Sequence, residues 1–302
     1  MLRRTADLLA FFILLALGRL LDYLKIFPTG TDKSLNLYVI YIALPALILR
    51  KVPELDFSGD MLAPLLMPWL VVLFSGLTVL LLCRLLRWSR ETTGALLLMV
   101  PLGNTAFLGV PMVERFFGAD AVSYAVLYDQ FGSFLILSSY GTFILALYSS
   151  GSKPAFLDVF RKVITFPPFV TLLVALLLRG IPLPDWLENL LSMTAESMTP
   201  VVMVSIGVQM RLLLPWDELS PLALGLFLRL LVTPLVFVGA CRLLDLSGTP
   251  VHVALFETAM PPMVMASVLA SVAGLKPQLS SAMAAYGILV AFFTLPVIYG
   301  VM

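Results

Sequence analysis

Long apolar runs alternate along the chain with short polar joints. A helix needs about 20 predominantly apolar residues to cross the roughly 30 Å of hydrocarbon in a bilayer. The pattern predicts ten such spans and no joint long enough to hold a soluble domain. The spans are expected at 6–25, 33–51, 61–86, 92–117, 120–149, 156–179, 185–212, 218–244, 250–274 and 277–301.

The first span has some features of a signal peptide, because Arg3 and Arg4 precede an apolar run. No small-residue cleavage pattern follows, and apolar character resumes through Leu24. We therefore interpret this segment as a first transmembrane helix that is retained.

Composition places the chain in the same class. Hydrophobic residues make up 60% of it and charged residues 12%, against about 45–50% and about 25% in soluble domains. A 302-residue chain of this kind needs the lipid bilayer as a solvent. The net charge of +1 and the absence of a basic block argue against nucleic acid as a partner. We expect a multi-pass protein of the plasma (inner) membrane.

Two halves of the chain resemble each other. The segment "CRLLRWS" at 83–89 returns 158 residues later as "CRLLDLS" at 241–247. Four further pairs recur at offsets of 155 to 157 residues: Pro28 and Pro184, Pro45 and Pro200, Pro64 and Pro221, Gly118 and Gly274. The pattern predicts two five-helix units, 1–151 and 152–302. Because five is odd, the second unit enters the membrane from the opposite side, which makes an inverted repeat. Cys83 and Cys241 would then lie on opposite faces, too far apart for a disulfide.

The distribution of lysine and arginine predicts the orientation. Eleven lie in or near joints that follow odd-numbered spans: Arg19, Lys25, Lys33, Arg84, Arg87, Arg90, Lys153, Arg161, Lys162, Arg211 and Lys276. Seven lie toward the other face: Arg3, Arg4, Arg50, Lys51, Arg115, Arg179 and Arg242. The positive-inside rule places the first group in the cytoplasm and both termini outside.

Two spans are interrupted at their centres. The fourth contains "PLGNTAFLGVP" (101–111) and the ninth contains "ETAMPPM" (257–263). Irregular backbone at membrane depth is tolerated where it lines a cavity, as in secondary transporters. We expect Asn104 to cap one half-helix and Pro261 and Pro262 to open another. Two half-helix N-termini would then meet near the bilayer centre, where their amides and partial positive charge suit a carboxylate.

These segments carry a resemblance to a known family. "GNTAFLGVPM" (103–112) resembles the asparagine-threonine-x-x-x-glycine-[Val/Ile]-proline motif of the auxin efflux carrier family, which includes the plant PIN-formed transporters and many bacterial carriers. "ETAMPPMVMASVLA" (257–270), "LPVIYG" (295–300) and "ALPALIL" (43–49) resemble its second crossover, last helix and second helix. The short joint "YSSGSKPAF" (148–156) lacks the long cytoplasmic insertion of the plant proteins, which indicates a bacterial member or a short form.

The resemblance implies an all-α membrane fold like that of the bile-acid sodium symporters. It implies ten helices in two inverted five-helix repeats, with broken helices 4 and 9 crossing each other. Helices 1, 2, 6 and 7 would form a support subdomain and helices 3–5 and 8–10 a transport subdomain that moves against it as an elevator. It also implies termini outside and a homodimer formed through the first helix. Bacterial members handle dicarboxylates and other organic acids, so the substrate is expected to be a small organic anion, either of that kind or auxin-like.

The candidate site residues fall into three groups. Substrate contact is expected of Gly103, Asn104, Thr105, Gln130, Pro261, Pro262 and Met263. The shape of the crossing is expected to depend on Pro45, Pro101, Gly109, Pro111 and Pro200. Ion coupling is a candidate role for Asp129, Arg229 and Glu257, because ionisable groups inside a membrane usually face the protein interior or water. Asp129 has the alternative of a purely structural role, and Glu257 that of a bridge to Arg229.

Other chemistry finds little support. The chain has one histidine and two cysteines, and it contains no phosphate-binding loop or nucleophile elbow. We therefore expect no enzyme, no metal and no resident cofactor, with protons or sodium as possible coupling ions. The favoured function is alternating-access transport of the anion. A sodium- or proton-coupled symporter of the bile-acid type and a membrane sensor that binds the anion without moving it remain alternatives.

Overall fold

The computed structural model describes residues 2–53, 61–148, 164–210 and 218–302. Within these ranges the regular structure is helical and contains no strand. Six helices are long and apolar enough to cross a membrane: Thr31–Lys51, Leu62–Leu85, Ala119–Tyr148, Asp185–Gln209, Leu219–Leu243 and Pro277–Val301. The protein is therefore an all-helical membrane protein, and the count of ten spans stays a prediction.

Most predicted spans correspond to more than one helical piece. In chain order the α-helices are α1 (Leu2–Tyr23), α2 (Thr31–Tyr38), α3 (Leu44–Lys51), α4 (Leu62–Leu85), α5 (Arg90–Met99), α6 (Val110–Phe117), α7 (Val122–Leu127), α8 (Thr142–Tyr148), α10 (Pro167–Leu177), α11 (Asp185–Glu196), α12 (Met198–Gln209), α13 (Leu219–Phe227), α14 (Thr233–Leu243), α15 (Thr249–Thr258), α16 (Val264–Val272) and α17 (Pro277–Val301). Wider π-helical turns join several of them: η1 (Val39–Ala43), η3 (Thr105–Gly109), η5 (Tyr128–Phe134), η6 (Leu137–Gly141) and η8 (Leu228–Val232). A short 3₁₀ turn, η4 (Ala119–Ala121), precedes α7.

The two interruptions lie where the sequence predicts them. The chain is non-helical between the end of α5 at Met99 and the start of η3 at Thr105, and again between α15 and α16. The two breaks touch, because the amide of Asn104 donates to the carbonyl of Pro261 at 2.8 Å and that of Met263 donates to Leu102 at 2.9 Å. An isolated antiparallel bridge pairs Gly103 with Pro262.

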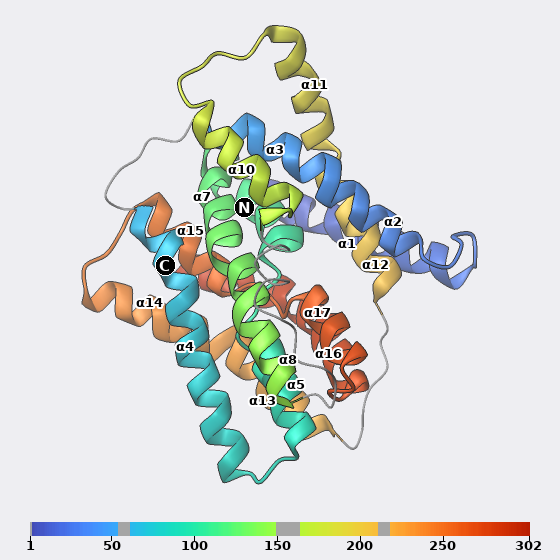
Figure 1. Cartoon of the computed structure of the whole chain (residues 1–302), viewed down its shortest axis with the longest axis vertical. Coiled ribbons are helices and arrows are strands. Elements are labelled where there is room, and N and C mark those ends of the chain that lie inside the picture. The colour runs from blue at the N-terminus through green and yellow to red at the C-terminus, as the bar shows by residue number, and fades with distance from the viewer. Residues whose placement is uncertain (1, 54–60, 149–163, 211–217) are drawn as a thin grey trace.

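Each interrupted segment passes from one hydrophobic core to another. Residues of α5 pack in a core with α13, α16 and part of α17, whereas α6 packs in a second core with α3, α7 and α15. The ninth segment makes the reverse change, since α15 contributes Phe256 to the second core and α16 contributes Ala266 to the first. In Figure 1, α3, α10 and α11 gather at one end of the molecule and α5 and α13 at the other, with α15 and α17 between them.

The repeated "CRLL" sequence produces the same helix ending twice. After α4, the amide of Trp88 donates to the carbonyl of Cys83 at 3.1 Å, and after α14 that of Leu246 donates to Cys241 at 2.8 Å. The residue before each donor, Arg87 or Asp245, has a positive φ of 55° or 53°. This is the Schellman arrangement of a helix C-terminus. The two cysteines are free and buried. The division at residue 151 and the inverted relation of the halves stay predictions.

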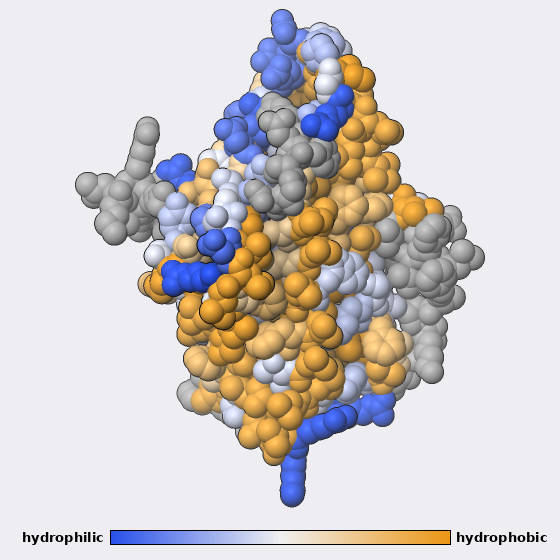
Figure 2. Space-filling model, turned by 90° about the vertical axis from the view of Figure 1, so that its left-hand side faces the viewer, coloured by the Kyte–Doolittle hydropathy of each residue, from blue (hydrophilic) through white to orange (hydrophobic). Residues whose placement is uncertain are grey.

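The surface matches a bilayer environment. Large apolar side chains are exposed along α4, including Leu66, Leu70, Leu73, Leu77 and Leu81. Figure 2 shows hydrophobic residues over most of one face, with hydrophilic residues gathered toward its upper end and at its lower tip. In water such exposed apolar surface would be costly, whereas hydrocarbon solvates it.

Candidate functional site

Asn104 is a buried polar side chain at the point where the two breaks meet. Its side chain is 1% exposed, and its amide nitrogen Nδ2 has no hydrogen-bond partner among the described residues. The residue occupies the N-cap position of η3, but its side chain makes no capping hydrogen bond. Its backbone carbonyl instead accepts bonds from the amides of Leu108 and Gly109. The predicted capping role is therefore wrong for the Asn104 side chain. Its Nδ2 group remains available to donate a hydrogen bond to another acceptor.

Asp129 is a buried carboxyl group that lies in contact with Thr105, the neighbour of Asn104. Its carboxylate accepts bonds from the hydroxyl of Thr105 at 2.5 Å and from the side-chain amide of Gln130 at 2.6 Å. The backbone amide of Ala106 also donates to it. Asp129 thus occupies the amide-rich start of the first half-helix. Both neighbours are buried, and the Oε1 atom of Gln130 has no partner among the described residues.

No described side chain plays this part at the start of the second half-helix. Helix α16 begins at Val264 with Met263 as its N-cap, and the Met263 side chain makes no capping hydrogen bond. The expectation that Pro261 and Pro262 open this half-helix is wrong, since both lie before its first turn. Pro262 is held in the bridge to Gly103, and the Pro261 carbonyl accepts the Asn104 amide. The prolines thus shape the break, and the free amide end belongs to the residues after them.

Arg229 lies within the π turn η8 and points at the carbonyl ends of both breaks. Its Nε donates to Met260 at 2.7 Å, and its Nη1 donates to Val100 at 3.2 Å and to Pro101 at 3.1 Å. The side chain is 1% exposed. No hydrogen bond joins Arg229 to Glu257 among the described residues, but the two groups interact electrostatically, so the alternative of a bridge between them stays a prediction.

Glu257 lies fully buried in the last turn of α15. Its exposed fraction is 0%, and both carboxylate oxygens lack a partner among the described residues. The carboxylate lies against the backbone of Gly109, where a β-carbon would be 2.1 Å from Oε2. A buried carboxylate without hydrogen bonds is costly as a free anion. It therefore requires a proton or a cation.

Other predicted residues mark places where a helix restarts. Pro45 and Pro111 each stand in the first two positions of a helix, after η1 and η3 respectively. Pro200 lies in the first turn of α12. Proline tolerates these positions because the first amides of a helix have no partner within it.

A small cavity adjoins the crossing. It measures about 120 Å³, and its polar lining consists of Asn104, Asp129 and Gln130. The remaining walls are apolar and include Ile40, Phe107 and Met265. These last three residues also line a second cavity of about 370 Å³ that reaches Asp32 and Gln209.

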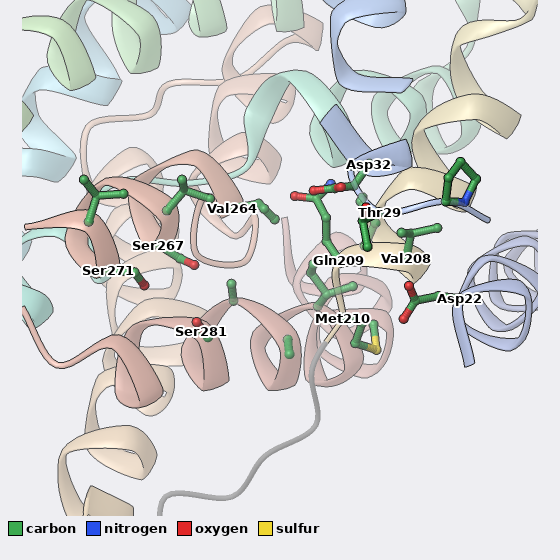
Figure 3. A pocket seen from close by; sticks show the side chains of 18 residues that line it. Asp22, Thr29, Asp32, Val208, Gln209, Met210, Val264, Ser267, Ser271 and Ser281 are labelled. Atoms are coloured by element: carbon green, nitrogen blue, oxygen red, sulfur yellow. The ribbon is translucent and has the colours of Figure 1, made fainter. Parts of the chain in front are cut away.

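The second cavity continues into a third of about 410 Å³, with which it shares Asp32, Gln209 and Val264. In Figure 3, Ser267 and Ser271 of α16 lie on the side turned toward Ser281 of α17, and Gln209 and Asp32 lie farther along. The three cavities therefore adjoin one another in a row that extends from the crossing toward Gly30. Sequence patterns do not indicate this wall, because its residues come from α1, α2, α12, α16 and α17 and from the joint before α2.

The fold and the site define an all-helical membrane protein whose two interrupted segments meet in its interior beside a cavity. A family model described as membrane transport protein matches residues 5–299. The chain therefore belongs to this family of membrane transporters, the auxin efflux carrier family, and the resemblance found in the sequence is confirmed.

Two relatives are themselves uncharacterized. The chain is 26% identical over 269 residues to an uncharacterized transporter of Methanothermobacter thermautotrophicus, covering 88% of this chain and 87% of the relative. It is 30% identical over 275 residues to the uncharacterized transporter MJ1031 of Methanocaldococcus jannaschii, covering 85% of each. Both relatives are archaeal, and the expected bacterial origin stays a prediction.

Proposed function

We propose that this protein is a secondary transporter that moves a small organic anion by alternating access and binds it beside Asn104. The observation that carries the proposal is the buried Nδ2 of Asn104, which has no partner among the described residues, lies at the meeting point of the breaks and lines a cavity. A buried donor without a partner costs free energy in the empty protein. A carboxylate oxygen would accept from it.

The uncapped start of α16 is the second half of the proposed site. Met263 and Met265 line the same cavity as Asn104. The first amides of a helix and its dipole favour a negative charge. The corresponding end of the first half-helix is already served by Asp129. The anion would therefore lie between the Asn104 amide and the start of α16. The cavity volume of about 120 Å³ is well below the roughly 300–1,000 Å³ typical for drug-sized ligands, which favours a small carboxylate over an indole acid.

Two buried acids near the site support coupling to protons. Asp129 lines the cavity itself, and Glu257 lies against Gly109 at the end of η3. A like charge nearby disfavours a bound anion, and the repulsion is strong where water is excluded. Protonation of these acids would remove that repulsion, so proton and anion would bind cooperatively. Sodium beside Glu257 would act in the same way and is the alternative coupling ion.

The test is charge movement by purified protein in proteoliposomes on a solid-supported membrane. A panel of monocarboxylates, dicarboxylates and indole acids is applied with and without sodium and a pH gradient. We expect a saturable current for a small carboxylate. Asn104→Ala should weaken apparent affinity by about ten- to a hundredfold, because a hydrogen bond to a charged group contributes about 1.5–3 kcal/mol. Asn189→Ala, at an exposed position of α11, is the matched control.

The other outcomes discriminate the alternatives. A current that requires sodium would favour a symporter of the bile-acid type. A current that loses its dependence on the pH gradient in Glu257→Gln would assign proton coupling to that residue. An anion that binds without current is then tested by counterflow of labelled substrate. Exchange would indicate electroneutral transport, and its absence would leave a membrane sensor.

A further inference from the structure

The carbonyl ends of two helices lie buried together at the crossing. The last carbonyl groups of a helix have no partner within it, and the helix end carries about half a negative charge. Val100 and Pro101 follow the end of α5, and Met260 follows the end of α15. All three residues are buried in the protein interior, out of reach of bulk water. Their carbonyl groups therefore need a hydrogen-bond donor or a cation inside the protein.

The guanidinium of Arg229 is that cation. It donates to Met260 of one break and to Val100 and Pro101 of the other, at 2.7 to 3.2 Å. A guanidinium is planar and always charged, and its five donors can serve carbonyl groups from two helices at once. Lysine carries a single compact charge and does not match this geometry.

Gly103 provides the room for this contact. A β-carbon at Gly103 would lie 1.9 Å from Nη2 of Arg229, so any side chain there would displace the guanidinium. The backbone of Gly103 is also the point where the breaks pair with each other. Gly103 and Arg229 therefore form a single contact between the two breaks, the crossing joint.

We propose that Arg229 is a positioning residue that acts as a built-in cation for the crossing and locks the carbonyl ends of α5 and α15 together. The two breaks then move as one body, and their joint needs no bound metal ion. This inference rests on the proposed function only in that the joined breaks shape the binding site. It moves Arg229 from the candidate coupling residues to the framework that supports them.

The joint can be tested by hydrogen–deuterium exchange of the protein in lipid nanodiscs, without any substrate. The amides of Asn104 and Met263 make the two hydrogen bonds between the breaks and act as reporters. In Arg229→Ala we expect both to exchange about ten- to a hundredfold faster, as the loss of charge-assisted hydrogen bonds implies. Added methylguanidinium should slow the exchange again. Arg242→Ala, which removes an exposed arginine near the end of α14, should leave both amides unchanged.

Two further variants keep the test decisive should Arg229→Ala not fold. Gly103→Ala displaces the guanidinium without removing its charge, and Arg229→Lys keeps a charge but not the fork. Both should raise exchange at the reporters, less than Arg229→Ala does. Wild-type protection should be equal in sodium and choline chloride.

Each contrary result has a definite meaning. Unchanged exchange in the Arg229 and Gly103 variants would overturn the proposal, as would faster exchange that methylguanidinium does not slow. Wild-type protection that depends on sodium would show that a metal ion supplies the charge instead. Because no substrate is used, failure of the joint and failure of the transport assay are separate outcomes.

Discussion

Among single residues, Gly109 and Glu257 make a contact that a single methyl group would break. A β-carbon at Gly109 would lie 2.1 Å from Oε2 and 2.6 Å from Oε1 of a carboxylate that is fully buried. We expect Gly109→Ala to lower the free energy of unfolding by about 1–3 kcal/mol, the usual cost of overpacking. Titration with sodium dodecyl sulfate of the protein in mixed micelles measures it.

A second substitution, at Glu257, shows whether contact with its carboxylate causes the loss of stability in Gly109→Ala. Shortening the acid in the double variant Gly109→Ala/Glu257→Ala should recover part of the loss, so the two changes should be non-additive. Gly239→Ala in α14 is the control, because no atom of the described residues outside its own helix lies within 4 Å of the added carbon. Strict additivity in the double variant would show that Gly109 acts through its backbone rather than through Glu257.

The residues of the crossing could be named from sequence, but most of their roles could not. Asn104 and Thr105 stand out because polar residues and prolines interrupt an apolar span. Arg229 stands out as a lone cation in another span. Its hydrogen-bond partners, however, are backbone carbonyl groups. Every residue has one, so the sequence does not indicate which of them Arg229 contacts. The contact of Thr105 with Asp129 joins residues 24 positions apart and depends on how two helices pack.

At the scale of elements, α1 and α12 approach each other through glycine. A β-carbon on Gly18 would lie 2.2 Å from the carbonyl oxygen of Val204, and one on Gly207 would lie 2.1 Å from that of Leu15. Small residues allow such close backbone contact between membrane helices. We expect either alanine variant to destabilise the protein by about 1–3 kcal/mol. The double variant should cost less than the sum, since separating the helices once relieves both contacts.

The same detergent titration measures this pair, with Gly300→Ala as the control. Gly300 lies in α17, and within the described part of the chain no atom outside that helix is within 4 Å of an added carbon. Two single variants as stable as the wild type would mean that α1 and α12 tolerate a wider separation.

The breaks were predictable at this scale, but the π turns were not. Proline and glycine residues mark the breaks at Pro101 and Pro261, because proline has no amide hydrogen to donate and glycine has no side chain. The π turns η1, η3, η5 and η8 surround the crossing and carry Thr105, Asp129 and Arg229. A π turn adds one residue to a helix and has no characteristic amino-acid composition, so hydrophobic periodicity does not reveal it. Such turns are frequent at functional sites.

At the scale of the whole molecule, the sequence predicts the membrane class, and the order in which apolar spans and joints follow each other. The row of adjoining cavities adds what periodicity does not contain, namely the side of the molecule toward which the cavities extend. Its outer lining includes Asp22 at the end of α1, Met210 after α12 and Val272 at the end of α16. Each of these residues lies near the end of an odd-numbered predicted span, namely the first, the seventh and the ninth. The charge count assigns that face to the cytoplasm, so we propose that the described conformation is open inward.

Thiol labelling tests this orientation. With Cys83 and Cys241 replaced by alanine, Ser281→Cys places a thiol on the cavity wall, and Ser247→Cys places a matched thiol on the exposed joint after α14. In intact cells a membrane-impermeant maleimide should label Ser247→Cys only. In inside-out vesicles it should label Ser281→Cys, and a bound substrate that closes the cavities should slow that reaction. The reverse pattern would place the termini in the cytoplasm and the row of cavities outside, because both thiols are assigned to their faces by the same count of lysine and arginine.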